Sequence, residues 1–400
     1  MSTSQDPVVI VSAARTPMGS FQGDFASLSA HDLGGAAIKA AVERAAAGSK
    51  FSAELVTEVL FGNCLMAGQG QAPARQAGFK GGLPKSAGAV TLSKMCGSGM
   101  RAAMFAHDML LAGSHDVLVA GGMESMTNAP YLMLKGRSGY RMGHDKIYDH
   151  MMLDGLEDAY EAGRSMGTFG EDCAAKYNFT RAEQDAFAMA SVERAKAATT
   201  SGAFQAEITP VTVKTRAGET VVSIDEGLGK VKLDKVTSLK PAFKKDGTIT
   251  AASSSSINDG AAALVMMRQS TADKLGCKAL ARIVSHATHA QEPEWFATAP
   301  VGATQKALAK AGWQIGDVDL WEVNEAFAVV PMALMKELNV PHDKVNVNGG
   351  ACALGHPIGA SGARIMVTLI HALKARGLKK GLATLCIGGG EGTAVALEII

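Results

Sequence analysis

Two glycine-rich stretches decide the fold, VLVAGGMES (Val117–Ser125) and LATLCIGGGEG (Leu382–Gly392). Each is an apolar run that closes on paired glycines. The same pattern at two distant places predicts an internal repeat far longer than a solenoid unit. The segments before them also match in order, because the first copy opens with VVIVSAA (Val8–Ala14) and the second with LARIVSHA (Leu280–Ala287). We therefore expect two similar halves.

Within each half, apolar runs alternate with helical stretches. IKAAVERA (Ile38–Ala45) and TQKALAKAG (Thr304–Gly312) have helical spacing. Each leads to a strand that ends in asparagine, VLFGN at Asn63 and LWEVN at Asn324. Strands that alternate with helices favour parallel βαβ units whose sheets are covered on both faces. The sequence therefore predicts an α/β protein made of two βαβ halves.

The segment between the halves has a different amino-acid composition. It is rich in Met, Gly, Asp and Lys and contains charged turns such as KKDG at Lys244–Gly247. Insertions of this length are usually functional, so we interpret the segment as an inserted loop domain. The predicted division is an N-terminal half over 1–124 and 257–279, the inserted domain over 125–256, and a C-terminal half over 280–400.

The composition excludes several classes of protein. Hydrophobic residues make up 47% and charged residues 19% of the 400 residues, with a formal net charge of +1. These values exclude a disordered chain and give no electrostatic reason to expect nucleic acid or an anionic membrane as partner. No apolar run approaches the ~18 residues that span a bilayer. Six dispersed cysteines and the absence of a leader pattern predict a reduced, cytoplasmic setting.

Cys96 lies in KMCGSG, between an extended stretch and a predicted helix from about Gly97 to Leu111. A helix N-terminus favours an anion and lowers the pKa of a thiol, so Cys96 is a candidate nucleophile. Gly97 and Gly99 leave space for a second molecule to approach the sulfur. On local features alone, a buried structural cysteine explains Cys96 equally well.

His356 lies among glycines in GHPIGASG, at the start of another predicted helix, a setting that favours function over core packing. Cys352 precedes it by four residues, but no second His/Cys pair completes a zinc set, and we expect no metal. Cys386 ends a strand against Gly388–Gly390, whose backbone N–H groups suit an oxyanion. Asn324 either orients water or a carbonyl, or is a turn asparagine.

One nucleophilic thiol, one histidine and a second cysteine fit acyl transfer through a covalent thioester. A hydrolase needs only one thiol. The second is explained if a thiolate removes a proton from a carbon acid, so that the new carbanion attacks the acyl-enzyme. The residues therefore favour carbon–carbon bond formation over hydrolysis.

The chain resembles the thiolase family over essentially its whole length. The resemblance rests on blocks in the family's order, CGSG at Cys96, GGMESM at Gly121, NEAF at Asn324, NVNGGACALGHPIGASGAR at Asn346 and CIGGGEG at Cys386. DEGLGK, QEPEWFATAP and WEVNEAF are most similar to the acetoacetyl-CoA thiolases. The resemblance implies a thiolase-like fold of two duplicated βαβ halves in five layers, α-β-α-β-α, with an inserted loop domain.

The resemblance also implies an acetyl-CoA C-acetyltransferase, which condenses two acetyl-CoA reversibly to acetoacetyl-CoA and CoA. Cys96 would accept the acetyl group, His356 would activate the Cys96 thiol, and Cys386 would be the general acid and base. His356 and a water held by Asn324 would form one oxyanion hole. The backbone N–H groups of Cys96 and Gly388 would form the other.

No permanently bound cofactor is implied, because CoA thioesters are the family's substrates. The resemblance places CoA against the inserted domain, beside Leu156, Met166, Lys230, Ala242, Phe243, Ala251 and Ser255. Many relatives read H-M-G where this chain has Ser165–Gly167, so a histidine contact to CoA is lost, and Lys230 is the one nearby cation where they carry arginine. Phe296 and Phe327 would narrow the acyl pocket toward acetyl and acetoacetyl groups, unless both rings are simply core.

A homotetramer, a dimer of dimers, is implied with Met126–Met142 as its tetramerisation loop, and neither nucleic acid nor a membrane is expected as partner. The first alternative is a degradative 3-ketoacyl-CoA thiolase for longer chains. A thiolase-like scaffold without catalysis is a second, but such a protein would have lost His356 or Cys386. A decarboxylating ketoacyl synthase is a third, but it would pair its cysteine with two histidines.

Overall fold

The computed structural model describes residues 6–215 and 218–400. Its main feature is a 10-stranded sheet in the order β12-β13-β14-β11-β1-β10-β5-β3-β4, with β2 paired to β10. The first-half strands are β1 (Val8–Arg15), β2 (Gly19–Ser20), β3 (Glu58–Gly62), β4 (Gly88–Leu92), β5 (Val117–Ser125) and β10 (Asn258–Arg268). The second-half strands are β11 (Ala281–Ala290), β12 (Leu320–Val323), β13 (Lys380–Ile387) and β14 (Glu391–Ile399). The halves meet where β1 pairs with β11 at Val9 and Ile10.

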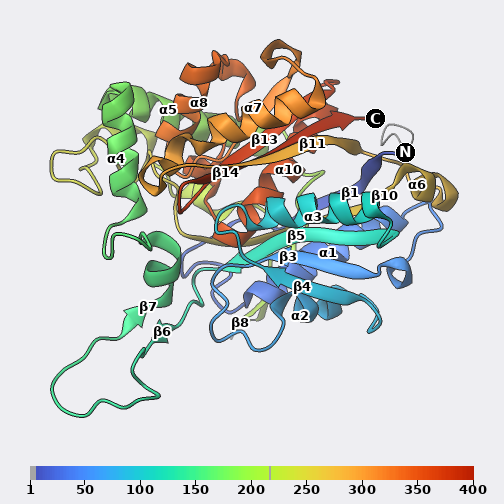
Figure 1. Ribbon diagram of the computed structural model, residues 1–400, viewed down its shortest axis with the longest axis horizontal. Coiled ribbons are helices and arrows are strands. Elements are labelled where there is room, and N and C mark those ends of the chain that lie inside the picture. Colours follow the sequence, from blue (N-terminus) through green and yellow to red (C-terminus); the bar gives the residue numbers. More distant parts are fainter. Residues whose placement is uncertain (1–5, 216–217) are drawn as a thin grey trace.

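Helices cover both faces of each half. The first half contributes α1 (Ala30–Ala46), α2 (Pro73–Lys80), α3 (Ser98–Ala112) and, after β10, α6 (Gln269–Leu275). The second half contributes α7 (Ala299–Ala311), α8 (Val329–Leu338), α9 (Ala351–Leu354) and α10 (Ile358–Ala375). Figure 1 shows α2 below the first-half strands, α7 and α8 above the second-half strands, and α3 and α10 between them, while α1 shares a hydrophobic cluster with α2. This succession gives the five layers that the resemblance implied.

The inner helices share one hydrophobic core. Met100 and Met104 of α3 and Ile365 and Leu369 of α10 belong to a single buried cluster that includes residues from both halves of the sheet. Burying apolar surface of this extent is the main favourable term in folding. The two halves therefore form one body rather than two independent units.

The two halves repeat the same connections. β3 is parallel to β4 and β5, and β12 is parallel to β13. The counterpart of β4 in the second half is reduced to an isolated parallel bridge between Trp321 and Val345. The predicted parallel units are thus present, whereas the remaining neighbours, which the pattern did not address, are antiparallel. β13 and β14, for example, are joined by a tight turn over Gly388–Gly390, and a hairpin is necessarily antiparallel.

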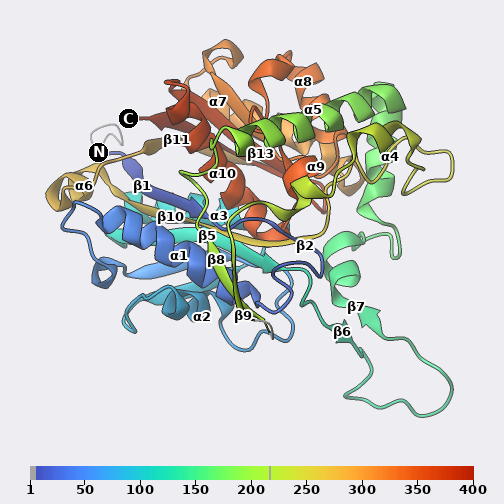
Figure 2. The same ribbon diagram turned by 180° about the vertical axis from the view of Figure 1, so that it is seen from behind.

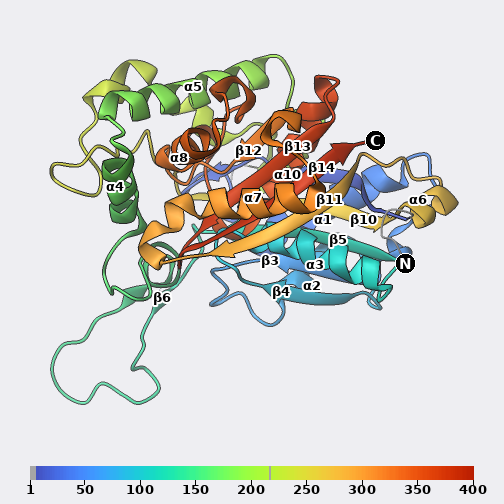
Figure 3. The same ribbon diagram turned by 45° about the horizontal axis from the view of Figure 1, so that its top comes forward.

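The inserted segment contains more helix than its composition suggested. It carries α4 (Met166–Tyr177) and α5 (Arg181–Thr200) between the short strand pairs β6 (Tyr131–Leu132) with β7 (Tyr148–Asp149), and β8 (Val211–Thr215) with β9 (Gly218–Val222). Figure 3 shows the β6–β7 arm extending away from the body, with α4 and α5 on the same side of the molecule. From behind, α5 lies across the second half near α9 (Figure 2). The inserted segment therefore forms a cap of helices and loops.

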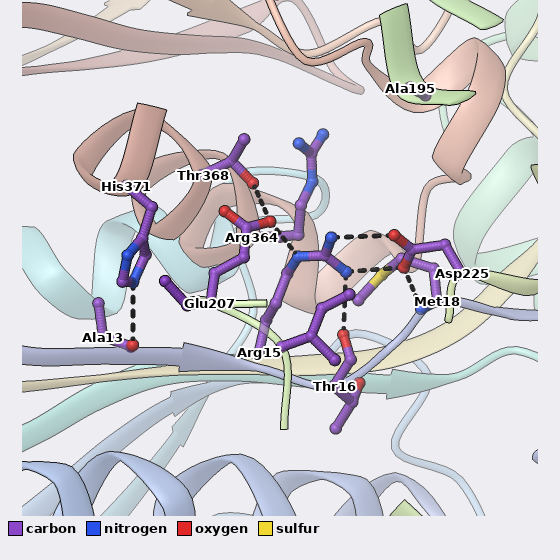
Figure 4. Close-up of polar contacts among 12 residues, drawn as sticks. Ala13, Arg15, Thr16, Met18, Ala195, Glu207, Asp225, Arg364, Thr368 and His371 are labelled. Carbon is purple, nitrogen blue, oxygen red and sulfur yellow. Dashed lines mark hydrogen bonds and ion pairs between the residues drawn. The ribbon is translucent and has the colours of Figure 1, made fainter. Parts of the chain in front are cut away.

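A buried ion network fixes this cap to the sheet. Arg15 at the end of β1 donates from Nη1 and Nη2 to Asp225 at 2.7 and 2.9 Å, and from Nε to Glu207 at 2.6 Å. Thr368 of α10 donates to the same Glu207 carboxylate at 3.1 Å (Figure 4). A bidentate guanidinium pair has a fixed geometry, so it also fixes the orientation of the segments that it joins.

No described helix combines the length and the apolar character needed to cross a membrane.

Glycine allows the backbones of β5 and α10 to approach closely. A Cβ atom on Gly122 would lie 2.1 Å from the carbonyl oxygen of Gly359. Non-bonded atoms do not approach to that distance, so one of the two segments would have to move. This contact holds the start of α10 against β5.

We expect Gly122→Ala to lower the thermal unfolding midpoint by several degrees, because overpacking costs about 1–3 kcal/mol or more. Gly316→Ala is the matched control, since a Cβ atom there meets no heavy atom of the described residues within 4 Å. Circular dichroism melts of both variants and the wild type measure the effect. Equal midpoints for Gly122→Ala and Gly316→Ala would contradict the proposed close contact.

Candidate active site

Cys96 lies on a sharp turn between β4 and α3. The preceding residue, Met95, has a left-handed backbone with φ of 45°, which non-glycine residues adopt rarely and at some cost in energy. The Ser98 hydroxyl donates to the Met95 carbonyl at 2.6 Å and accepts from the Lys94 N–H at 2.8 Å. Lys94 also forms an ion pair with Glu391 at the start of β14. The turn is therefore held against the β13–β14 hairpin.

The Cys96 sulfur receives two backbone N–H groups, its own and that of Gly388. Burial is nevertheless the largest influence and raises the pKa of Cys96 to about 11. The prediction that the helix N-terminus lowers this pKa is wrong for the unliganded site, because desolvation of the thiolate outweighs the nearby N–H dipoles. The resting sulfur is a protonated thiol, and its activation requires a base.

His356 supplies a suitable base. Its Nδ1 lies 2.6 Å from the hydroxyl oxygen of Ser361, and that hydroxyl lies 2.8 Å from the carbonyl oxygen of Pro357. Because the single Ser361 hydrogen is directed to Pro357, the Ser361 oxygen accepts from Nδ1–H of His356. Nε2 is then the unprotonated nitrogen, and this buried atom has no partner among the described residues. The imidazole is therefore oriented with a free lone pair.

The surroundings also keep His356 neutral. Burial, and after it the positive charge of Arg364, lower the pKa of His356 to about 3. Arg364 is itself fully buried on α10, with its Nη1 3.6 Å from Glu322 of β12. At neutral pH the imidazole therefore accepts a proton only when a partner charge develops beside it.

Asn324 follows β12 directly and lies next to the imidazole. Its backbone N–H donates to the Thr384 carbonyl of β13 at 3.0 Å, which fixes the residue at the end of the sheet. The side-chain Nδ2 lies 3.5 Å from Nδ1 of His356, and the buried Oδ1 has no partner within the described part of the chain. A buried polar atom without a partner is unusual, and it suits a bound water.

Cys386 lies on the second-half side of the same site. It is the penultimate residue of β13 and its side chain is fully buried. Its pKa lies well above the ordinary value, first because of burial and then because of the nearby Cys96 sulfur. The structure thus brings Cys96, His356 and Cys386 to one place, although the first and last are almost three hundred residues apart in the chain.

A small chamber opens at Cys96. It has a volume of about 60 Å³. Its walls include most of the residues expected there, together with four that the sequence did not single out. The lining residues are Met95, Cys96, Gly155, Leu156, Met166, Ser255, Phe296, Ala326, Phe327, His356, Ile358 and Gly388. A volume of this size holds only a few heavy atoms.

The chamber continues into a wider cleft of about 300 Å³. The two share Leu156, Met166, Ser255, Phe327, His356 and Ile358 as lining residues. Phe243 and Ser165 line only the wider part. A wide entrance that narrows to a small closed end suits a long, flexible ligand with a small reactive tip.

Aromatic rings close the chamber and also belong to the core. Phe296 and Phe327 meet edge to face with ring centroids 6.4 Å apart, and Phe243 meets Phe327 at 5.6 Å. Phe296 and Phe327 are both buried members of the second-half core. Phe296 and Phe327 are therefore both core residues and walls of the acyl pocket, since the core holds the rings rigidly where they line the chamber.

Three expected CoA contacts line neither the chamber nor the wider cleft. Lys230 and Ala251 line a separate hollow of about 180 Å³, which shares Ser254 and Ser256 with the wider cleft. Lys230 is exposed and pairs with Glu226 at 2.5 Å. The N–H of Ala242, beside Phe243, donates to the Ile249 carbonyl at 2.9 Å. The hollow of Lys230 and Ala251 therefore adjoins the wider cleft and does not include the reactive sulfur.

Two residues that organise the site were not predicted from the sequence. Ser361 fixes the tautomer of His356, and its signal was the serine of GASG one helical turn after the histidine. Glu124 of β5 ties the loop after β3 to the start of α10. It accepts hydrogen bonds from the N–H groups of Cys64, Leu65 and Gly359 at 3.0, 3.1 and 2.8 Å, and from the Asn63 amide at 2.5 Å. GGMES contained Glu124, but a buried carboxylate is not predictable from a local pattern.

We expect the alkylation of Cys96 by iodoacetamide to become about tenfold faster per pH unit between about pH 7 and about pH 9. The reason is that the thiolate is the reactive form and the pKa of Cys96 is about 11. Peptide mass spectrometry measures the rate at Cys96, and Cys96→Ala identifies background labelling. A rate independent of pH over this range would show a stable thiolate–imidazolium pair and contradict the neutral resting site.

Comparison with known proteins agrees with this geometry. Residues 8–270 match the family description "Thiolase, N-terminal domain", and residues 277–399 match "Thiolase, C-terminal domain". An acetyl-CoA acetyltransferase of Chromobacterium violaceum is 51% identical over 393 residues, covering 98% of this chain and 99% of that protein. One from Escherichia coli is 52% identical over 392 residues, covering 98% of each.

Solved structures show the same likeness. The crystal structure of the Bacillus anthracis acetyl-CoA acetyltransferase superposes with a TM-score of 0.95 at 40% identity, covering 99% of both chains. A thiolase from Ascaris suum in complex with coenzyme A gives a TM-score of 0.92 at 40% identity, covering 98% of this chain and 100% of that one. Matched in both halves and over its whole fold, the chain belongs to the thiolase family.

Proposed function

We propose that the protein is an acetyl-CoA C-acetyltransferase, which condenses two acetyl-CoA to acetoacetyl-CoA and CoA and also runs the reverse cleavage. The observation that carries the proposal is that Cys96 and His356 line the narrow end of one cleft, while the buried Cys386 is close enough to Cys96 for the two sulfurs to interact electrostatically. Relatives that are 51% and 52% identical over nearly the whole chain carry the name acetyl-CoA acetyltransferase. Two thiols around one imidazole suit condensation, whereas hydrolysis needs one thiol.

In the first half-reaction, Nε2 of His356 takes the proton of the Cys96 thiol as the sulfur attacks the acetyl carbonyl carbon. The bond between that carbon and the CoA sulfur then breaks. The CoA thiolate leaves with the proton of Cys386. This step produces acetyl-Cys96, an imidazolium and a Cys386 thiolate, so the proton count is balanced. The two new charges stabilise each other in a buried site, where Coulomb interactions are strong.

In the second half-reaction, the Cys386 thiolate removes a proton from the methyl group of a second acetyl-CoA. The resulting carbanion attacks the carbonyl carbon of acetyl-Cys96, and the bond from that carbon to the Cys96 sulfur breaks. The departing thiolate recovers the proton held by His356. All three side chains return to their neutral resting forms, in agreement with the pKa directions of the unliganded site.

Two sets of donors would stabilise the developing oxyanions. The N–H groups of Cys96 and Gly388, which are directed to the sulfur in the resting site, would receive the oxygen of the acetyl-Cys96 carbonyl. Protonated Nε2 of His356 and a water on Asn324 would receive the thioester oxygen of the CoA substrate. Each set of preorganised donors is typically worth about 3 kcal/mol.

CoA would occupy the wider cleft, with the acyl thioester at Cys96. Leu156, Met166, Phe243 and Ser255 would contact the pantetheine arm, because they line the cleft. The hollow that contains Lys230 and Ala251 would receive the distant end of CoA. Its one cation is already paired with Glu226, so Lys230 would have to exchange this partner to reach a phosphate.

We further propose that the protein is a cytoplasmic homotetramer, a dimer of dimers. We also propose three domains, an N-terminal half over 1–124 and 257–279, an inserted domain over 125–256 and a C-terminal half over 280–400. The assembly is supported by the projecting β6–β7 arm, which carries the exposed side chains of Tyr131, Met133, Leu134 and Met142. Apolar side chains gathered on an exposed arm usually mark a protein–protein contact. The arm coincides with the segment assigned to tetramerisation.

Brief exposure to acetyl-CoA should place one acetyl group on the peptide that contains Cys96, and none in Cys96→Ala. Intact-mass and peptide mass spectrometry measure this transfer. We expect Cys386→Ala still to become acetylated, because a thiolate can leave without first taking a proton, but to lower condensation by about 100-fold or more, because removal of the methyl proton needs a base and a general acid–base is worth about that factor. Loss of both activities in Cys386→Ala would contradict the division of roles.

The small chamber should restrict the acyl chain. We expect kcat/KM for acetoacetyl-CoA to exceed that for a C8 ketoacyl-CoA, and Phe296→Ala to raise the C8 value relative to acetoacetyl-CoA by about tenfold or more, since one methylene is worth about 1–3 kcal/mol of discrimination. Phe79→Ala, at an exposed ring on α2, is the matched control. A wild-type preference for the C8 substrate would instead favour the degradative thiolase.

A further inference from the structure

A second cluster of chemically active side chains lies away from the active site. His107 and Asp108 are on α3, in the first half, and His286 is on β11, in the second half. Nε2 of His286 lies 3.2 Å from Nδ1 of His107 and 2.9 Å from Oδ1 of Asp108. The third side of the triangle, from Nδ1 of His107 to Oδ1 of Asp108, is 3.2 Å. In the described part of the chain, this is the one group of three His, Cys, Asp or Glu residues close enough to share an ion.

The triangle has the dimensions of a metal site. A tetrahedral Zn²⁺ with bonds of about 2.0–2.1 Å holds its ligand atoms about 3.3 Å apart. The three observed separations lie slightly below this value, so a small outward movement of the side chains would accommodate the ion. The two imidazole rings are nearly perpendicular, with an interplanar angle of 89°, so their nitrogen atoms approach a common point from different directions.

The ligand atoms are also in the required protonation states. Burial lowers the pKa of both His107 and His286, so both rings are neutral near pH 7 and have a lone pair to offer. The pKa of Asp108 is lowered because the two histidines outweigh the effect of its partial burial. Metal binding therefore requires the loss of the imidazole N–H hydrogen bonds to Asp108, two at most, and no deprotonation of a neutral ring.

We propose that His107, Asp108 and His286 form a binding site for a divalent transition-metal ion such as Zn²⁺. Two imidazoles and one carboxylate make up the three protein ligands, and solvent supplies the fourth. The open position is on the Asp108 side, where the side chain is 52% exposed, whereas the histidines are 12% and 14% exposed. Sequence spacing could not predict the site, since it joins residues 178 and 179 positions apart.

The site would act on stability rather than on the chemistry at Cys96. His107 is eleven residues further along the chain than Cys96, or about 16 Å at the rise of an α-helix. A bound ion would cross-link α3 of the first half to β11 of the second. Nearby positive charges on Lys310 and Arg101 act on His286, so we expect weaker binding than at a closed four-ligand site.

The test compares four proteins, the wild type, His286→Gln, Asp108→Asn and the control His115→Gln. His115 is a suitable control because it pairs with a single carboxylate, Glu58, at 3.1 Å and has no second histidine in the pair. The thiols that also bind zinc are common to all four proteins. Calorimetric titration with Zn²⁺ should give one equivalent fewer in His286→Gln and Asp108→Asn than in the wild type and His115→Gln.

Thermal melts provide an independent measurement. Zn²⁺ should raise the unfolding midpoint of the wild type and of His115→Gln by several degrees more than that of the two cluster variants, because a ligand that binds only the native state stabilises it. Mg²⁺ should have no such effect, since it prefers oxygen ligands. If His286→Gln does not fold, Asp108→Asn, at a half-exposed position, decides the question. Equal stoichiometry and equal shifts in all four proteins would overturn the proposal and leave a hydrogen-bonded triad only.

Discussion

The close crossing of α3 and α10 is the constraint on which the rest of the structure depends. A Cβ atom on Gly99 would lie 2.9 Å from the Ala363 nitrogen, and one on Gly362 would lie 2.5 Å from the Met100 nitrogen. Cys96 and His356 lie just before the first residues of these two helices. The distance between the backbones therefore fixes the distance between sulfur and imidazole. A core made of larger side chains would pack equally well, but it would separate the two reactive groups.

The same burial that holds the site together sets its electrostatics. Desolvation raises the pKa of the Cys96 thiol and lowers that of the His356 imidazole, so the resting groups are neutral. A permanent ion pair in this chamber would carry a desolvation penalty even without substrate. Neutral groups avoid that penalty, and charge develops only when an acyl group provides an oxygen for the oxyanion donors. The dry, closed chamber therefore favours the transition state over the resting thiolate.

Sequence patterns predicted the elements that occur in both halves, and they missed features that occur at only one place in the chain. The doubled order of strands and helices, and the placement of Cys96 and His356 before helices, followed from periodicity and glycine spacing. Periodicity failed for α5, whose buried face includes Gln184, Asp185 and Ser191, because small and polar residues at buried positions hide the apolar pattern. The direction of the Cys96 pKa shift was also missed, since a local pattern shows the helix N-terminus but not the protein that covers it.

The repeat also explains how one scaffold acquired an asymmetric site. Asn63 and Asn324 follow equivalent strands, and Oδ1 of both is buried without a partner among the residues described. Their Nδ2 atoms differ, because that of Asn63 donates to the structural carboxylate Glu124 at 2.5 Å, whereas that of Asn324 lies 3.5 Å from Nδ1 of His356. Gly122 of β5 leaves room for α10, whereas Gly388–Gly390 form the turn of the β13–β14 hairpin, whose Gly388 N–H is directed to the Cys96 sulfur. The first half therefore uses its copies for packing and the second leaves its copies free for ligands. Native proteins satisfy buried polar groups except where function requires otherwise. The first half therefore supplies the nucleophile Cys96 together with packing contacts, whereas the second half supplies the groups that act on it, His356, Asn324 and Cys386.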